Sequence, residues 1–123
     1  MTMATKRLGQ AGEDRAAAFL ESCDYRIAAR NYRVPVGEID IIAVKDNTVV
    51  FVEVKTRRSI RYGTPAQAVS WYKKKKIIRT AYWFLHHAGI SGCDCRFDVI
   101  EVYAGAGEDW QIRHIPGAFE TQG

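Results

Sequence analysis

Acidic side chains and a lysine gather in one stretch of the sequence, GEIDIIAVKDNTVVFVEVKT, which spans residues 37–56. The candidates for chemistry are Glu38, Asp40, Glu53 and Lys55. Carboxylate oxygens are the ligands that hard divalent cations such as Mg²⁺ or Mn²⁺ prefer. Two carboxylates side by side repel each other, and a bound cation or a nearby lysine removes that cost. These residue types therefore indicate a site for Mg²⁺ or Mn²⁺.

Two β-strands joined by a tight turn at Asp46-Asn47 would bring these side chains together. With that turn Lys45 faces Thr48, and the register follows by counting back along both strands. The expected opposite pairs are Asp40 with Glu53 and Glu38 with Lys55. Opposite residues project from the same face of a sheet, so we expect all four candidates on one face. On the other face we expect their apolar neighbours Ile39, Ile41, Val52 and Val54.

A wet face on a half-buried hairpin is the alternative interpretation, because alternating charge most often marks an exposed face. The residues farther along the charged face are apolar: Ile42, Val44, Val49 and Phe51. A strand that is apolar on both faces is buried on both faces, so the charged end would lie in a pocket of a covered sheet. The residues alone leave both interpretations open.

A helix expected over residues 5–23 supplies a third carboxylate, Glu13, which borders an apolar stripe at helical spacing. Gly9 and Gly12 each cost a helix about 1 kcal/mol relative to Ala. Their small size therefore indicates that another backbone or a substrate comes close. Glu13 is a candidate metal ligand on this basis, and an exposed flank or an i,i+4 ion pair is the alternative.

Positive charge clusters directly after the acidic stretch. The chain has a formal net charge of +4 and a pI of about 9.1. Clustered Lys and Arg are the usual footprint of phosphate-backbone binding, although a lone charge run is most often a solvated face. Next to a carboxylate cluster, the run favours nucleic acid. The residues expected to contact it are Arg57, Arg58, Arg61, Lys73 and Lys76.

A second helix is expected over residues 64–88, with Thr64 as its N-cap and Gly89 at its end. Lys73 falls on the apolar stripe of this helix, so its side chain must snorkel to water or reach into the site. Four aromatic residues thicken the helix, and we expect core packing rather than base stacking from them: Trp71, Tyr72, Tyr82 and Trp83.

The length of 123 residues predicts one domain, placed at residues 1–116, with a loose C-terminal tail at residues 117–123. Further strands are expected over residues 25–34, 96–103 and 110–115, which gives an α/β fold with the order αβββαββ. Three cysteines argue against a full disulfide framework. The N-terminus lacks the apolar core of a signal peptide, and no apolar stretch approaches the roughly 20 residues that span a bilayer. We expect a cytoplasmic protein without membrane contact.

Four phrases along the chain resemble a known family. Asp40, followed on the next strand by Glu53-Val54-Lys55, resembles the PD-(D/E)XK nuclease pattern, although Ile39 stands where the pattern has proline. The chain is more similar still to the bacterial YraN-type endonuclease family, which is related to archaeal Holliday junction resolvases. The phrases that carry the resemblance are GQAGEDRAAAFL (9–20), RNYRVPVGEIDIIA (30–43), VFVEVKTR (50–57) and CRFDVIEV (95–102).

The resemblance implies a restriction-endonuclease-like α/β core, in which helices flank a mixed sheet. It implies Mg²⁺ (or Mn²⁺) bound by Asp40 and Glu53, a catalytic Lys55, and Glu13 as a further catalytic and metal-binding residue. Glu38 is an extra acid that binds the metal or pairs with Lys55. The implied activity is hydrolysis of phosphodiester bonds of DNA, with branched or junction DNA as the candidate substrate.

Three alternatives stay open. A non-catalytic nucleic-acid-binding or adaptor module of recombination or repair would use the same fold and basic surface. Binding alone does not need the set Asp40, Glu53 and Lys55, which argues for the enzyme. RNA stays open beside DNA as the partner, and a homodimer stays open because resolvase-like relatives dimerise to cut two strands.

Overall fold

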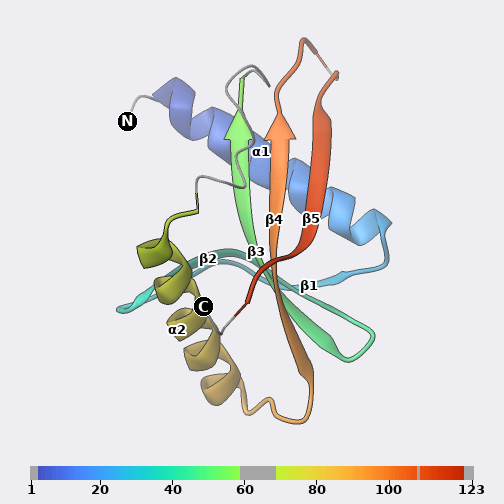
Figure 1. Ribbon diagram of the computed structural model, residues 1–123. Coiled ribbons are helices and arrows are strands. Elements are labelled where there is room, and N and C mark those ends of the chain that lie inside the picture. The colour runs from blue at the N-terminus through green and yellow to red at the C-terminus, as the bar shows by residue number, and fades with distance from the viewer. Residues whose placement is uncertain (1–2, 59–68, 108, 121–123) are drawn as a thin grey trace.

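The computed structural model describes residues 3–58, 69–107 and 109–120. Within these ranges a five-stranded sheet, in the order β1-β2-β3-β4-β5, is flanked by two helices (Figure 1). The elements are α1 (Met3–Ser22), β1 (Arg26–Val34), β2 (Gly37–Lys45), β3 (Thr48–Arg57), α2 (Trp71–Ala88), β4 (Asp94–Tyr103) and β5 (Gln111–Phe119). The predicted α/β class and element order are confirmed. Neither described helix combines the length and hydropathy of a membrane-spanning segment.

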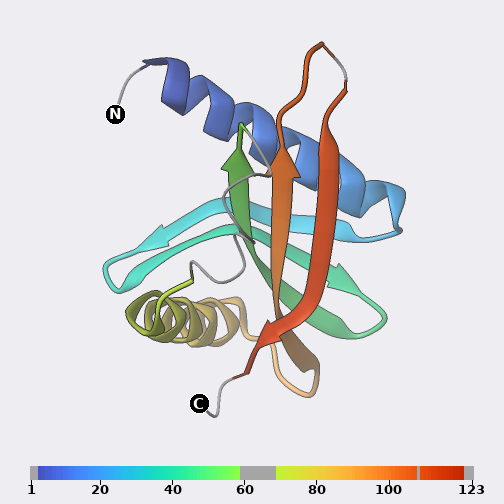
Figure 2. The ribbon, with the colours of Figure 1, turned by 45° about the horizontal axis from the view of Figure 1, so that its top comes forward.

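The sheet is mixed, because β3 and β4 pair in parallel while the other neighbours pair antiparallel. A parallel pair needs a crossover connection, and α2 lies in the one between β3 and β4. Figure 2 shows the β1–β2 hairpin running across the direction of β3, β4 and β5, with α1 and α2 on opposite sides of the sheet. The helices therefore cover both faces of the central strand β3.

Each face of the sheet carries its own apolar core. On the face toward α1 the buried residues include Ala16, Leu20, Ile41, Val52 and Ile100. On the face toward α2 they include Ile42, Phe51, Ile77, Ala81 and Phe97. Consecutive residues of β3 thus pack into different cores, as the predicted covered sheet requires.

The turn at Asp46-Asn47 has φ angles of 49° and 60°, which is the left-handed conformation that a two-residue hairpin turn of type I′ uses. The predicted register is confirmed from Lys45↔Thr48 to Ile41↔Val52, where the β2–β3 pairing ends. Beyond this point β2 stays paired with β1 as far as Gly37, and β3 stays paired with β4 as far as Arg57. The two strands therefore separate at the charged end of the hairpin.

This separation overturns part of the predicted geometry. Asp40 is not a ladder partner of Glu53, and Ile39 packs in the core toward α2 while Ile41 packs in the core toward α1. The expected common face of Ile39 and Ile41 is therefore wrong. The neighbouring strand carries Asn31 at a φ of 51°, between the pairs Arg30↔Ile41 and Tyr32↔Ile39, and this left-handed residue breaks the regular alternation.

Helix α1 approaches β3 closely at Gly12. A Cβ atom at this position would lie 1.9 Å from Oγ1 of Thr56, so only glycine fits. The group that comes close to Gly12 is thus the side chain of Thr56 rather than another backbone, and Gly9 has open space around it. The contact brings Glu13, the next residue of α1, against the end of the sheet where β2 and β3 separate.

Helix α2 begins later than expected. Ser70 caps it by accepting a hydrogen bond from the amide of Lys73 at 3.1 Å, and Val69 lies before the helix rather than in it. The expected cap Thr64 lies outside the described residues. The end at Gly89 is confirmed, with a φ of 66°. The predicted burial of the four helix aromatics is wrong, because all are exposed: Trp71, Tyr72, Tyr82 and Trp83.

The C-terminal strand extends farther than expected. β5 includes residues 117–119, which the sequence assigned to a loose tail, and it pairs Phe119 with Phe97. The two rings stack with centroids 5.2 Å apart. An apolar residue at 119 gives the strand a reason to continue, since its side chain closes the core toward α2.

Candidate active site

Asp40 lies where β2 leaves β3. Its Oδ2 accepts a hydrogen bond of 2.8 Å from the amide of Val54, an amide of β3 beyond the last β2–β3 pair. The pKa of Asp40 is raised from 3.8 to about 7. Burial is the largest cause, and the negative charge of Glu53 is the second. Glu13 contributes in the same direction. Asp40 is thus a half-buried carboxyl group within electrostatic reach of two other carboxylates.

Glu53 is buried on β3, with 6% of its side chain exposed, and two ammonium groups meet it. Nζ of Lys73 lies 2.6 Å from Oε1 of Glu53, and Nζ of Lys55 lies 3.4 Å from the same oxygen. Burial lowers the pKa of Lys55. Burial also acts to lower the pKa of Lys73, but its contacts with Glu53 and the charge of Asp40 outweigh this and raise the pKa.

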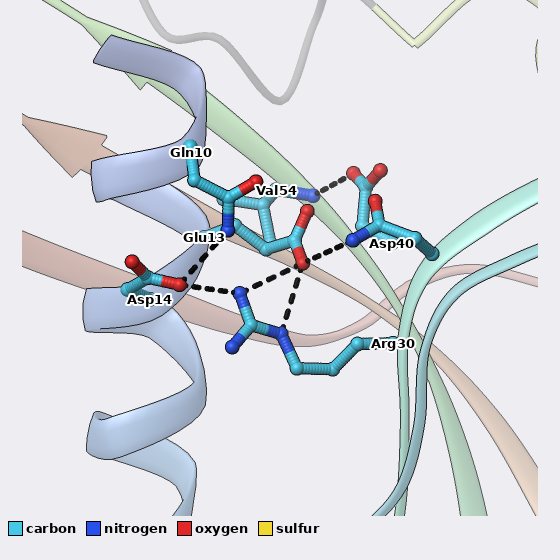
Figure 3. A network of polar contacts seen from close by, with 7 residues as sticks. Gln10, Glu13, Asp14, Arg30, Asp40 and Val54 are labelled. Atoms are coloured by element: carbon cyan, nitrogen blue, oxygen red, sulfur yellow. Dashed lines mark hydrogen bonds and ion pairs between the residues drawn. The ribbon is translucent and has the colours of Figure 1, made fainter. Parts of the chain in front are cut away.

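Glu13 reaches the same region from α1 (Figure 3). Its Oε1 accepts hydrogen bonds of 3.0 Å from Nε of Arg30 and 3.0 Å from Nδ2 of Asn31. Arg30 also binds Asp14 at 2.6 Å, and this bond lowers the pKa of Asp14. Glu13 and Asp40 line one cavity of about 580 Å³ between α1 and the separating strands.

The structure brings the four main sequence candidates together, although not by the predicted pairing. Glu13 comes from α1, Asp40 from β2, and Glu53 and Lys55 from β3. Glu38 behaves differently from expectation, because it forms an exposed ion pair of 2.9 Å with Arg33 rather than with Lys55. Glu38 still lines the cavity that contains Asp40.

The predicted nucleic-acid contacts are spread over two elements. Arg57 is half-buried at the end of β3, Arg58 is exposed after it, and Lys76 is exposed on α2. The side chain of Lys73 contacts Glu53, which is one of the two outcomes expected from its position on the apolar stripe of the helix. Arg61 lies outside the described residues.

Sequence reasoning missed three residues near the site. Arg30 and Asn31, which hold Glu13, lie in the strand predicted over residues 25–34, and their position at the start of the phrase RNYRVPVGEIDIIA was the only signal for them. Glu101 is fully buried on β4 as the register partner of Lys55, and its Oε2 accepts a hydrogen bond from the hydroxyl of Tyr103. Its Oε1 has no hydrogen-bond partner among the residues that the structure describes. The alternation in RFDVIEVY places this acid among buried residues, and that signal was available.

The donor set suits a divalent cation, although it is not assembled around one. No group of three or more His, Cys, Asp or Glu side chains in the described ranges is arranged to hold a metal ion as it stands. Asp40 and Glu53 offer carboxylate oxygens only, which suits Mg²⁺ or Mn²⁺. The raised pKa of Asp40 means that burial and the neighbouring carboxylates destabilise its ionised form, which a cation would stabilise. Such a cation would have to take the place of Lys73 beside Glu53.

Comparison with known proteins places the chain in a family. The model of the uncharacterised protein family UPF0102 matches residues 12–102. A UPF0102 protein of Moorella thermoacetica is 45% identical over 120 residues, which cover 97% of this chain and 100% of the relative. One of Symbiobacterium thermophilum is 48% identical over 117 residues, which cover 95% of this chain and 99% of the relative. The resemblance to YraN-type proteins is thereby confirmed, and the chain belongs to the uncharacterised protein family UPF0102.

Proposed function

We propose that this protein is a divalent-metal-dependent nuclease that hydrolyses phosphodiester bonds of DNA. The observation that carries the proposal is the position of Asp40, half-buried where β2 leaves β3, in one cavity with Glu13 and bonded to the amide of Val54, the residue after Glu53. Carboxylates gathered in a partly buried site are costly without a cation, so such a group is a candidate for function rather than stability. Lys55 beside Glu53 completes the set of the PD-(D/E)XK pattern.

Each residue then has a chemical role. Asp40 and Glu53 would hold Mg²⁺ or Mn²⁺, with Glu13 as a further ligand. The chemistry that such an ion would supply is polarisation of a phosphoryl oxygen and a lowered pKa of water, which otherwise resists attacking a phosphodiester. Lys55 donates hydrogen bonds to the charge that grows on the phosphoryl oxygens or orients the attacking water. Arg30 and Asn31 fix the carboxylate of Glu13.

The basic residues near the site favour a nucleic acid as the substrate. Arg57 and Arg58 follow Lys55 after one intervening residue, Thr56, and Lys76 lies on the same helix as Lys73. Their charge attracts a phosphate backbone. Branched or junction DNA is the candidate substrate. The three cysteines are free, in keeping with a reducing cytoplasm as the proposed location.

A panel of linear, nicked, flapped and four-way DNA tests the proposal, with Mg²⁺ and Mn²⁺ supplied separately. The wild-type protein should cleave at least one substrate, and the variants Glu53→Ala and Lys55→Ala should not, while circular dichroism shows that both fold. Glu21→Ala, which removes an exposed carboxylate of α1, is the matched control and should cleave normally. Full activity of clean Glu53→Ala protein refutes the proposal.

A non-catalytic binding module is the second candidate. The 2.6 Å contact between Lys73 and Glu53 favours it, because Glu53 already has a cationic partner without a metal. Calorimetric titration with Mn²⁺ separates the two candidates. A nuclease should take up Mn²⁺ and lose this uptake in Asp40→Ala, whereas a pure binder should show no uptake and no nicking.

A further inference from the structure

Helix α2 presents an unusual surface to the solvent. The helix carries five cationic residues and no carboxylate. Its buried residues are Ile77, Thr80 and Ala81, and Ile78, Phe84 and Leu85 pack against the core of the sheet. Ala88, the last residue of the helix, is exposed. The outer face of α2 is defined here by the exposed residues that precede Ala88: Trp71, Tyr72, Lys75, Lys76, Arg79, Tyr82, Trp83, His86 and His87. Every side chain on this face is therefore an aromatic ring or a cation.

Three aromatic rings on the outer face, those of Trp71, Tyr72 and Trp83, are exposed but contact neighbouring side chains. Trp71 is 58% exposed, and the ammonium group of Lys75 lies 4.2 Å from the centroid of its ring. Tyr72 meets the edge of Trp71 at 5.3 Å between centroids. Trp83 is 39% exposed and stacks on His87 at 4.7 Å. Rings ordered before binding lose less entropy when a ligand stacks on them.

The composition of the outer face argues against a second copy as its occupant. A second copy docked on the same face would set Lys75, Lys76 and Arg79 opposite an identical set of cations, with no acid on the helix to compensate. A lipid surface would have only Trp and Tyr side chains of this helix to insert, and it is therefore an arm of the test. Every Ile, Leu and Phe side chain of α2 packs against the sheet instead.

We infer that the outer face of α2 binds single-stranded nucleic acid. Bases stack on exposed aromatic rings, and phosphates bind Lys and Arg between them, which is how sequence-tolerant single-strand sites work. A duplex hides the faces of its bases, so it can use only the cations. Trp71 and Trp83 are about 18 Å apart along the helix axis, which leaves room for several bases.

The outer face lies next to the candidate active site. Lys73, on the opposite side of the same helix, contacts Glu53 at 2.6 Å. Tyr72, Lys73 and Lys76 line a cleft that also includes Gly37 and Glu38 at the start of β2. A strand held on α2 would thus lead toward the carboxylates. The inference deepens the proposed function and rests on it only for the fate of the bound strand, because the binding itself needs no catalysis.

Fluorescence anisotropy in EDTA tests the inference, since chelation prevents cleavage. The probes are a labelled oligothymidylate of about 20 nucleotides and a duplex of equal length. The test variant is the double substitution Trp71→Leu and Tyr82→Leu, which keeps apolar bulk but removes two exposed rings. The matched control is Trp110→Leu, which changes a half-buried Trp that lies under Arg15, away from α2.

The wild-type protein should bind the single strand more tightly than the duplex. The double variant should lose about tenfold or more of its single-strand affinity and keep its duplex affinity, because each stacked base contributes substantially. Trp110→Leu should bind like the wild type. The inference is overturned if the duplex binds as tightly as the single strand or if the double variant binds like the wild type. It is equally overturned if anionic vesicles bind while the oligonucleotide does not.

Anisotropy in EDTA, combined with the cleavage assay in Mg²⁺ or Mn²⁺, separates this inference from the proposed function. Single-strand binding without any metal-dependent cleavage would leave the inference standing and remove the nuclease. Cleavage that persists in the double variant with unchanged affinity would remove the inference and leave the nuclease.

Discussion

Nζ of Lys73 lies 2.6 Å from Oε1 of Glu53, closer than the 3.4 Å that separates the same oxygen from Nζ of Lys55. The nearer lysine comes from α2, and the farther one comes from β3, the strand of Glu53 itself. The crossover helix therefore supplies the nearest positive charge to a carboxylate that is proposed to bind a metal. Lys73 and a divalent cation would compete for the same oxygen.

Replacing Lys73 by Met should expose this competition. The variant should bind Mn²⁺ more tightly than the wild type, because no ammonium group has to leave Glu53. Without Mn²⁺ it should lose on the order of 1–2 kcal/mol of stability, since a buried carboxylate loses a partner. Thermal unfolding with and without Mn²⁺ measures both effects. Lys75→Met, on the exposed face of the same helix, is the control and should change neither. Equal Mn²⁺ affinities for Lys73→Met and the wild type would contradict the competition.

The pKa of Asp40 predicts how stability depends on pH. Burial raises it from 3.8 to about 7, so the folded protein holds a proton that the unfolded chain has released. The stabilising contribution is present below about pH 3.8 and is lost as the pH rises through about 7. Asp40→Asn, which cannot ionise, should therefore be more stable than the wild type at pH 8, by about 1 kcal/mol or more. Urea unfolding at pH 5 and pH 8 measures the difference.

The control for this experiment is Glu38→Gln, which changes an exposed acid in an ion pair with Arg33. It should show no comparable gain at pH 8. A wild-type protein whose stability relative to Asp40→Asn is the same at both pH values would rule out the raised pKa.

The surroundings of Gly12 and Gly9 predict opposite effects of alanine substitution on the stability of the protein. Gly12→Ala places a Cβ 1.9 Å from Oγ1 of Thr56, so α1 or β3 must shift, at a cost of about 1–3 kcal/mol. Gly9→Ala meets nothing within 4 Å and should stabilise the helix by up to about 1 kcal/mol. Chemical unfolding of the two variants gives the sign of each change. A stabilising Gly12→Ala would show that α1 does not lie against β3 as described.

Asp98 should stabilise the protein through its charge. It is fully buried on β4 and accepts hydrogen bonds from Arg96 at 2.8 Å, His114 at 2.7 Å and the amide of Gly117 at 3.0 Å. Burial acts to raise its pKa, but these bonds outweigh burial and lower the pKa. The contribution is therefore present above about pH 3.8 and is lost at lower pH. Asp98→Asn should cost about 2–4 kcal/mol at pH 7 in urea unfolding.

The cost of Asp98→Asn should shrink as the pH falls through the range where Asp98 of the wild type takes up its proton. Asp94→Asn is the control on the same strand, because Asp94 is exposed and should tolerate the change at any pH. Similar losses in both variants would mean that the buried network around Asp98 contributes little.

The order of elements and most of the register could be predicted from local signals. Asp46-Asn47 fixes the hairpin because both residues tolerate a positive φ, and counting from that turn gives the correct pairs as far as Ile41↔Val52. Counting fails beyond this pair, since it assumes a continuous ladder. The separation of β2 from β3 depends on the pairing of β2 with β1 and on the packing of α1 and α2 against opposite faces of the sheet. No local sequence pattern indicates these long-range contacts.

The residue types of the site could be predicted from the sequence, but their relative positions in the fold could not. Asp40 and Glu53 lie close enough to interact, but they approach across a gap rather than as a ladder pair. On α2 the aromatics were assigned to the core because large rings are usually buried. Helical spacing puts Trp71 and Tyr82 on the same side as Lys75, so the signal for an exposed face was present in the sequence.

The parallel pairing of β3 with β4 has a consequence for how the protein folds during its synthesis. Glu13, Asp40, Glu53 and Lys55 all lie within the first 55 residues, whereas β4 comes from Asp94–Tyr103. On the ribosome, β3 stays an unpaired edge until that later strand emerges. A nascent chain that already contains every proposed metal ligand therefore cannot yet build the site, and the activity proposed for it must wait until β4 has been synthesised.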